Sequence, residues 1–101
     1  MPVPPQGVRN AARKALEVRK ELPPSRQAGT PVGVKRASDL ARGANISLDT
    51  IIRMRSYLLR AKPNYDDARA QGKDIETSKA IQAYYLWGGP RALAWVRSIL
   101  N

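Results

Sequence analysis

The sequence contains no cysteine, no histidine and no phenylalanine. Without cysteine there is no disulfide bond, no thiol nucleophile and no cysteine-ligated zinc. Without histidine the chain lacks the commonest general base and the commonest metal ligand. What remains for chemistry is 8 carboxylates, 4 tyrosines and scattered hydroxyls. We therefore expect a protein that is not an enzyme and that uses neither a metal nor a cofactor.

Acidic residues are also scarce. The 18 Lys and Arg side chains outnumber 8 Asp and Glu, which gives a formal net charge of +10 in 101 residues. This balance predicts attraction to polyanions, with nucleic acid as the first candidate, a membrane surface as the second and an acidic protein face as the third. Residues 1–62 carry a net charge of +9 and residues 63–101 a net charge of +1. The asymmetry indicates one half of the chain that faces a polyanion.

Long apolar runs are missing too, and no stretch of the sequence is long enough to span a bilayer. The first residues show no charged segment followed by an apolar one, as a signal peptide would. We therefore expect a protein that is neither secreted nor held in a membrane. Its location would be the cytoplasm or the inside of a particle.

Apolar residues recur every three or four positions, which is typical of amphipathic helices. With the Gly and Pro breaks, this spacing predicts an all-α fold, a bundle of four to five helices in one domain spanning 1–101. The expected helices span 6–22, 34–42, 48–61, 78–87 and 91–100. The expected segments are an extended arm at 1–5, a basic helical half at 6–62, a polar loop at 63–76 and a C-terminal helical hairpin at 77–101.

The sequence also predicts where the third helix ends and which large side chains are buried. Pro63 should end the third helix because proline removes a helical donor and clashes with the preceding turn. One or two helical turns at 65–71 are an alternative to a loop there. The side chains expected to be substantially buried are Ile51, Leu58, Trp87 and Trp95.

Residues 39–54 resemble the helix-turn-helix pattern of repressors, without a gap. Ala41 is the small residue that lets the second helix approach, and Asn45 occupies the turn position where positive φ is needed. Ser47 is a good N-cap for the second helix. Two ordinary packed helices joined by a short turn would produce the same pattern.

In a helix-turn-helix pair at 37–60, the second helix would lie in the major groove. Arg53 could donate two hydrogen bonds to a guanine edge. Leu48 and Ile52 are apolar near this face, which suits a protein interface better. The residues predicted to contact nucleic acid, with duplex DNA as the main candidate, are Arg9, Arg13, Lys35, Arg36, Arg42, Ser47, Thr50, Arg53, Ser56 and Arg60.

Several segments resemble a short module of tailed phages, which occurs alone or fused to head-morphogenesis proteins such as capsid maturation proteases. The most specific matches are Gly29-Thr30-Pro31-Val32-Gly33-Val34 and Trp87-Gly88-Gly89. The likeness covers nearly the whole chain and departs from the module at Pro90 and at 61–64. It implies a phage setting, in the host cytoplasm or the virion, and association with the head or the packaged genome, but no reaction.

Two main functions remain open. The first is a small non-enzymatic phage protein that binds nucleic acid through the pair at 37–60. The second is a virion structural or assembly protein, associated with capsid, portal or connector, that uses the same helices to bind protein partners. Self-association is compatible with both, and a small effector that binds a host protein such as RNA polymerase is a third hypothesis. Salt separates them, because backbone-driven DNA binding weakens steeply with salt and an apolar protein interface does not.

Overall fold

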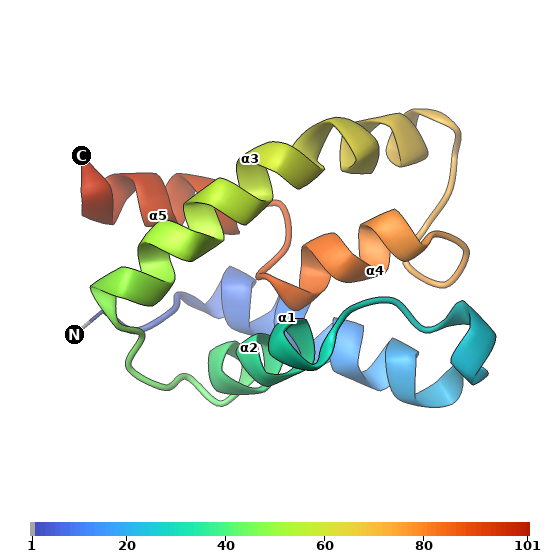
Figure 1. Ribbon diagram of the computed structural model, residues 1–101, viewed down its shortest axis with the longest axis horizontal. Helices are drawn as coiled ribbons and strands as arrows, with labels where there is room; N and C mark the ends of the chain where they lie inside the picture. Colours follow the sequence, from blue (N-terminus) through green and yellow to red (C-terminus); the bar gives the residue numbers. More distant parts are fainter. Residues whose placement is uncertain (1) are drawn as a thin grey trace.

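The computed structural model describes residues 2–101, and no strand occurs among them. The helices are α1 (Gln6–Glu21), α2 (Pro31–Ala41), α3 (Leu48–Ala70), α4 (Lys79–Leu86) and α5 (Ala92–Leu100), with a short 3-10 helix at Pro24–Arg26. This architecture confirms the predicted all-α class and the small helical bundle. α3 runs along one side of the molecule, α1 and α2 lie on the opposite side, and α4 lies between them (Figure 1).

α4 is the central helix of the bundle. It packs against α1, α2 and α3, whereas α5 packs against α3. The C-terminal helical hairpin expected at 77–101 is therefore not formed, since α4 and α5 make few contacts with each other. The reason is the turn at Gly88 and Gly89, which directs the chain toward α3 instead of back along α4.

The core is built from aliphatic side chains and one tyrosine pair. Tyr65 of α3 stacks on Tyr84 of α4, with 4.3 Å between ring centroids. Ile51 and Leu58 are fully buried, as predicted. Trp87 and Trp95 are partly buried and pack against the edge of the core. The other large and fully enclosed side chains include Val8, Leu40, Met54, Ile81, Leu86 and Val96.

The third helix does not end at Pro63. α3 continues to Ala70, so the first half of the polar loop expected at 63–76 is helical. A proline inside a helix costs stability, but Tyr65 and Ala68 beyond it are buried in the core. An ion pair between Lys62 Nζ and Asp66 Oδ2, at 2.6 Å, also spans the proline. Burial of the following turn therefore overrides the local helix-breaking signal.

The second helix starts three residues earlier than the spacing predicted. Thr30 is its N-cap, and its hydroxyl accepts a hydrogen bond from the Gly33 backbone N–H at 3.2 Å. Pro31 fits the first helical position because its φ is already helical. Gly33 is buried in the helix, where a Cβ would lie 3.3 Å from Nε1 of Trp87. The segment 29–34 thus forms a helix start that packs against Trp87.

The Gly88–Gly89 turn brings α4 close to α1. Both glycines have positive φ, 110° and 76°, which side chains disfavour. A Cβ on Gly89 would lie 2.6 Å from Cβ of Ala11, and one on Gly88 would lie 2.9 Å from Cγ1 of Val8. Backbone conformation and close packing therefore both require glycine here.

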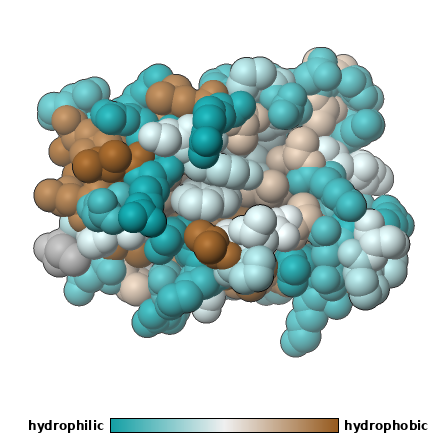
Figure 2. Space-filling model, viewed as in Figure 1, coloured by the Kyte–Doolittle hydropathy of each residue, from teal (hydrophilic) through white to brown (hydrophobic). Residues whose placement is uncertain are grey.

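The surface is mostly polar, but Val3, Val32 and three residues of α3 are large hydrophobic side chains that are exposed. Leu48, Ile52 and Leu59 are 55%, 45% and 43% exposed. Their spacing places them on one side of α3, and we call these three residues the apolar stripe. Figure 2 shows hydrophobic side chains gathered at the end of the molecule where α3 begins and α5 ends.

Candidate nucleic-acid interface

The pair at 37–60 does not form a packed helix-turn-helix. α2 packs against α1 and α4, α3 packs against α4 and α5, and α2 and α3 contact each other little. Trp87 lies between them. Its ring stacks on Tyr57 of α3, with 4.4 Å between centroids, and its Nε1 faces Gly33 of α2. The indole thus occupies the space in which the two helices would cross.

The turn between α2 and α3 also differs from the prediction. The residue with positive φ is Gly43, at 71°, and not Asn45; no non-glycine residue among 2–101 has positive φ. Gly43 directly follows Arg42, the C-cap of α2, where glycine is favoured. The Arg9 guanidinium packs here, since a Cβ on Gly43 would lie 3.0 Å from its Cζ. Arg9, predicted to contact nucleic acid, therefore packs against the turn.

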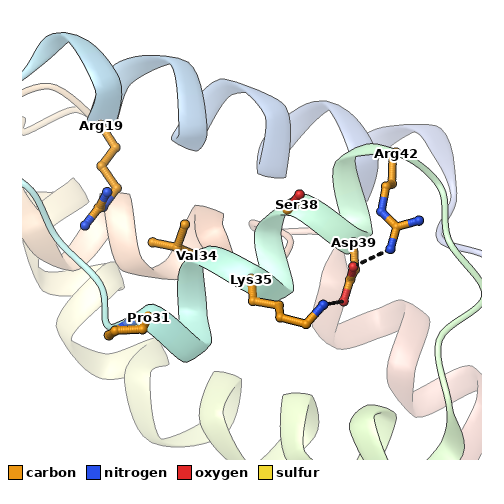
Figure 3. A pocket seen from close by; sticks show the side chains of 7 residues that line it. All are labelled: Arg19, Pro31, Val34, Lys35, Ser38, Asp39 and Arg42. Atoms are coloured by element: carbon orange, nitrogen blue, oxygen red, sulfur yellow. Dashed lines mark hydrogen bonds and ion pairs between the residues drawn. The ribbon is translucent and has the colours of Figure 1, made fainter.

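A groove of about 570 Å³ lies beside α2, and we call it the α1–α2 groove. Figure 3 shows Arg19 and Arg42 at its two ends, with Lys35 and Asp39 between them. Arg19 is held in place because its Nε donates a hydrogen bond to the Ala28 carbonyl at 2.9 Å. The groove is lined by Arg19, Pro31, Val34, Lys35, Ser38, Asp39 and Arg42.

A second groove of about 420 Å³, the α2–α3 groove, lies between α2 and Arg53 of α3. It is lined by Pro31, Val32, Lys35, Arg36 and Arg53. Because Pro31 and Lys35 line both grooves, the two hollows meet over α2. Their cationic side chains form one area that we call the basic surface, namely Arg19, Lys35, Arg36, Arg42 and Arg53.

Asp39 organises the cations of α2. Its carboxylate oxygens lie 2.7 Å from Arg42 Nη2, 3.6 Å from Lys35 Nζ and 3.9 Å from Arg36 Nη1. Burial acts to raise the pKa of Asp39, but the hydrogen bond from Arg42 and the charges of Lys35 and Arg42 outweigh it and hold the pKa below its ordinary value. Asp39 is therefore ionised at neutral pH and keeps three cations on one side of α2.

Arg36 and Arg53 face the α2–α3 groove with different freedom. The Arg36 side chain is only 17% exposed, and its guanidinium carbon lies 5.8 Å from the centre of the Trp87 ring, a cation–π contact. The Arg53 side chain is 69% exposed and pairs with Asp49 at 3.3 Å. Exposed ion pairs contribute little stability. Arg36 is thus fixed, whereas Arg53 can exchange partners at small cost.

The remaining predicted contact residues lie outside the two grooves. Ser47 caps α3; its Oγ accepts from the Thr50 backbone N–H at 3.2 Å and donates to Thr50 Oγ1 at 3.0 Å. Ser56 and Arg60 are exposed further along α3. Arg13 of α1 donates a hydrogen bond to Asn10 at 3.2 Å. Of the ten predicted residues, the structure brings together Lys35, Arg36, Arg42 and Arg53.

Two members of this site were missed in the sequence. Arg19 continues the spacing of the buried residues Val8, Ala12 and Ala15. A cation at a position that faces the neighbouring helices could have indicated that Arg19 belongs to a site. Asp39 follows Lys35 by four residues and precedes Arg42 by three. Those are the separations at which helical side chains pair.

The arrangement suits anions. Within residues 2–101, no three acidic side chains gather as a metal site would require, and no helix is both long enough and apolar enough to cross a membrane. Comparisons with protein-family models, with curated proteins and with solved structures found no match for this chain. Fold and site therefore define a small all-α protein with two adjoining cation-lined grooves.

Proposed function

We propose that this protein binds nucleic acid, duplex DNA in particular, through the basic surface. The observation that carries the proposal is the meeting of two cation-lined grooves over α2, with side chains from α1, α2 and α3. Lys and Arg side chains bind phosphates and release condensed counterions, which drives binding at low salt. The net charge of +10 adds long-range attraction to such a polyanion.

The contacts that the geometry supports are with the phosphate backbone. Reading bases requires side chains that are free to reach base edges in a groove. Ser47 and Thr50 are hydrogen-bonded in the α3 cap, whereas the exposed Arg53 lines the α2–α3 groove with Lys35 and Arg36. Backbone contacts carry no sequence information directly, so binding should tolerate changes in DNA sequence.

The setting that we propose is a tailed phage, with the protein acting on the genome or at the head and not as an enzyme. The likeness of segments 29–34 and 87–89 to the phage module supports this setting. In the structure these two segments pack against each other, with Gly33 facing the Trp87 indole. Because the two segments contact each other, we expect them to occur together in proteins that share this fold. This holds whichever surface such proteins use for binding.

A second candidate function is that of a virion structural or assembly protein that docks on a head component. The observation that favours it is the apolar stripe, with Leu48 55% exposed and Ile52 45% exposed. Contiguous exposed apolar side chains are typical of protein contact sites. The stripe lies on α3, and none of its three residues lines either groove, although Arg53 next to Ile52 lines the α2–α3 groove.

A gel-shift titration with mixed-sequence duplex DNA at low salt tests the first proposal, and we expect retardation at micromolar protein. The double variant Lys35→Gln/Arg42→Gln should bind about tenfold more weakly and lose about two units of salt slope. Both side chains are exposed, at 74% and 65%, so the chain should still fold. Because the variant also removes two partners of Asp39, its thermal melt is compared with that of the wild type.

The matched control is Arg13→Gln/Lys14→Gln, which removes the same charge from α1 outside both grooves. It should bind almost as the wild type does. Absence of retardation at about 50 µM protein would refute the function, since non-specific dissociation constants are typically lower at low salt. Equal losses in both double variants would assign binding to overall charge instead of to the basic surface.

A further inference from the structure

We propose that the α2–α3 groove is a phosphate site, in which Arg36 is a fixed anchor and Arg53 a movable second ligand. The inference rests on the proposed function only in taking nucleic acid as the source of the phosphate. The site itself is defined by the side chains that line the groove.

Arg36 is held before any ligand arrives. Its stem is buried, its Nε is enclosed without a hydrogen-bond partner, and its guanidinium lies over the Trp87 ring at 5.8 Å. The nearest carboxylate oxygen, on Asp39, is 3.9 Å away and therefore beyond hydrogen-bond distance. The terminal nitrogens of Arg36 thus remain available to an anion with several oxygens, such as phosphate, to which a guanidinium can donate two parallel hydrogen bonds.

Arg53 supplies the second cation from the facing helix. Its present partner, Asp49, is 76% exposed and offers one carboxylate. A phosphate already bound to Arg36 and Lys35 would offer Arg53 more charge and more acceptor oxygens in a less hydrated place. Arg53 should therefore turn from Asp49 toward the groove when phosphate binds.

The lining of the two grooves decides between them. Asp39 lines the α1–α2 groove, where its carboxylate repels an anion directly, whereas it reaches the α2–α3 groove only through its ion pairs with Lys35 and Arg36, at 3.6 Å and 3.9 Å. The residues that line the α2–α3 groove include three cations and no carboxylate. Its other walls are Pro31 and Val32, at the start of α2. A single phosphate should thus prefer the α2–α3 groove.

Trp87 reports on this site because its indole lies under Arg36 and its Nε1 faces α2. The test is a titration of the ¹⁵N-labelled full chain with inorganic phosphate at constant ionic strength, followed by the two indole N–H signals. Trp95→Phe assigns the signals. We expect a saturable shift of the Trp87 signal with millimolar affinity and little shift of Trp95.

Variants test the separate roles. Arg36→Gln and Arg53→Gln should each weaken phosphate binding at least about fivefold, and Arg36→Lys should restore less than half of the loss because it lacks the planar fork. Asp49→Asn should strengthen binding about twofold, since it frees Arg53 from an exposed pair. The control, Arg97→Gln on α5, removes one charge that does not line the groove and should change the affinity less than about twofold.

The outcomes separate the site from the function. If Arg36→Gln and Arg53→Gln leave the phosphate titration unchanged, the site is overturned, even where duplex DNA still binds. If phosphate binding needs both arginines while duplex DNA is never retarded, the site stands, the proposed function fails and free phosphate compounds are the ligands. A thermal melt of each variant shows whether it is folded, and Asp49→Asn tests the site by a gain that misfolding cannot mimic.

Discussion

The two helices on either side of Trp87 expose different chemistry. α2 presents cations arranged by the half-buried Asp39, and its Arg36 is fixed over the indole. α3 presents the apolar stripe and exposed ion pairs such as Arg53 with Asp49. The sequence pattern alone assigns both proposed functions to the same helix pair. The residues of the apolar stripe line neither groove, so the two proposed functions can be tested with separate variants.

The difference follows from how each helix is supported. α2 rests on α1 and α4 and turns its cations toward two grooves. α3 packs against α4 and α5. Next to this buried face, the apolar stripe of α3 stays exposed. Trp87 joins the two supports, because it contacts Tyr57 on one helix and faces Gly33 on the other.

The largest effect should come from breaking the turn that places Trp87. Gly89→Ala puts a side chain at φ 76° and 2.6 Å from Cβ of Ala11. Strain from positive φ and overpacking together should cost about 3 kcal/mol in the free energy of unfolding. The measurement is urea unfolding followed by far-UV circular dichroism.

Gly72→Ala is the matched control for Gly89→Ala. Its φ is 78°, but a Cβ there meets nothing within 4 Å. It should cost only about 1 kcal/mol, the penalty for positive φ alone. Equal losses at both positions would mean that the close approach to α1 contributes nothing.

A smaller effect should separate the two surfaces directly. Leu48→Asp/Ile52→Asp places charge on the apolar stripe at exposed positions, where substitutions usually change stability by less than about 0.5 kcal/mol. We expect this variant to lose association with any head protein that docks on α3. Its affinity for duplex DNA should fall only about two- to threefold, because the added negative charge is off the basic surface.

The opposite result is expected for Lys35→Gln/Arg42→Gln, which changes the basic surface and leaves the apolar stripe intact. This variant should lose about tenfold in DNA affinity and keep its association with head proteins. Measuring both variants by gel shift and by pull-down with purified head proteins completes the test. If either variant loses both activities while its melting curve is unchanged, α2 and α3 act as one surface and the separation is wrong.

Local signals in the sequence predicted the local features of the fold. The all-α class, the cap at Ser47 and the helix end at Gly88 and Gly89 follow from periodicity and from residue conformational preferences. Pro63 misled because its helix-breaking tendency is local, while the burial of Tyr65 and Ala68 that overrides it is tertiary.

The candidate site was less accessible to sequence reasoning. The pattern at 39–54 predicted a turn between two helices, but whether those helices touch depends on Trp87, which lies more than thirty residues later. The positive φ fell on Gly43 because glycine follows the C-cap directly, which leaves Asn45 in an ordinary conformation. Arg19 joins the basic surface through the packing of α1 on α2, a contact that no spacing along α2 can encode.

The smallest expected effect is on the pH dependence of stability. It is measured at one acidic residue on each helix, Asp39 of α2 and Asp49 of α3. Hydrogen bonding and charge from Arg42 and Lys35 outweigh burial and hold the folded-state pKa of Asp39 below the ordinary 3.8. The ionised form is therefore favoured by folding, so this stabilisation is complete above pH 3.8 and is lost as pH falls through the folded-state pKa. Asp39→Asn should be less stable than the wild type near neutrality, and the difference should shrink on acidification below 3.8.

Thermal melts of the wild type, Asp39→Asn and Asp49→Asn from about pH 7 to about pH 2 check this expectation. Asp49 is 76% exposed beside a 69% exposed Arg53, so Asp49→Asn should match the wild type within about 0.5 kcal/mol at every pH. The pKa of Asp74 is also lowered, chiefly by its hydrogen bond with Thr77, but Asp74 is present in all three proteins and cancels in the differences. A difference for Asp39→Asn that stays constant or grows on acidification would show that Asp39 does not hold the cations of α2 by its charge, and the contrast between the two helices would then lose its electrostatic basis.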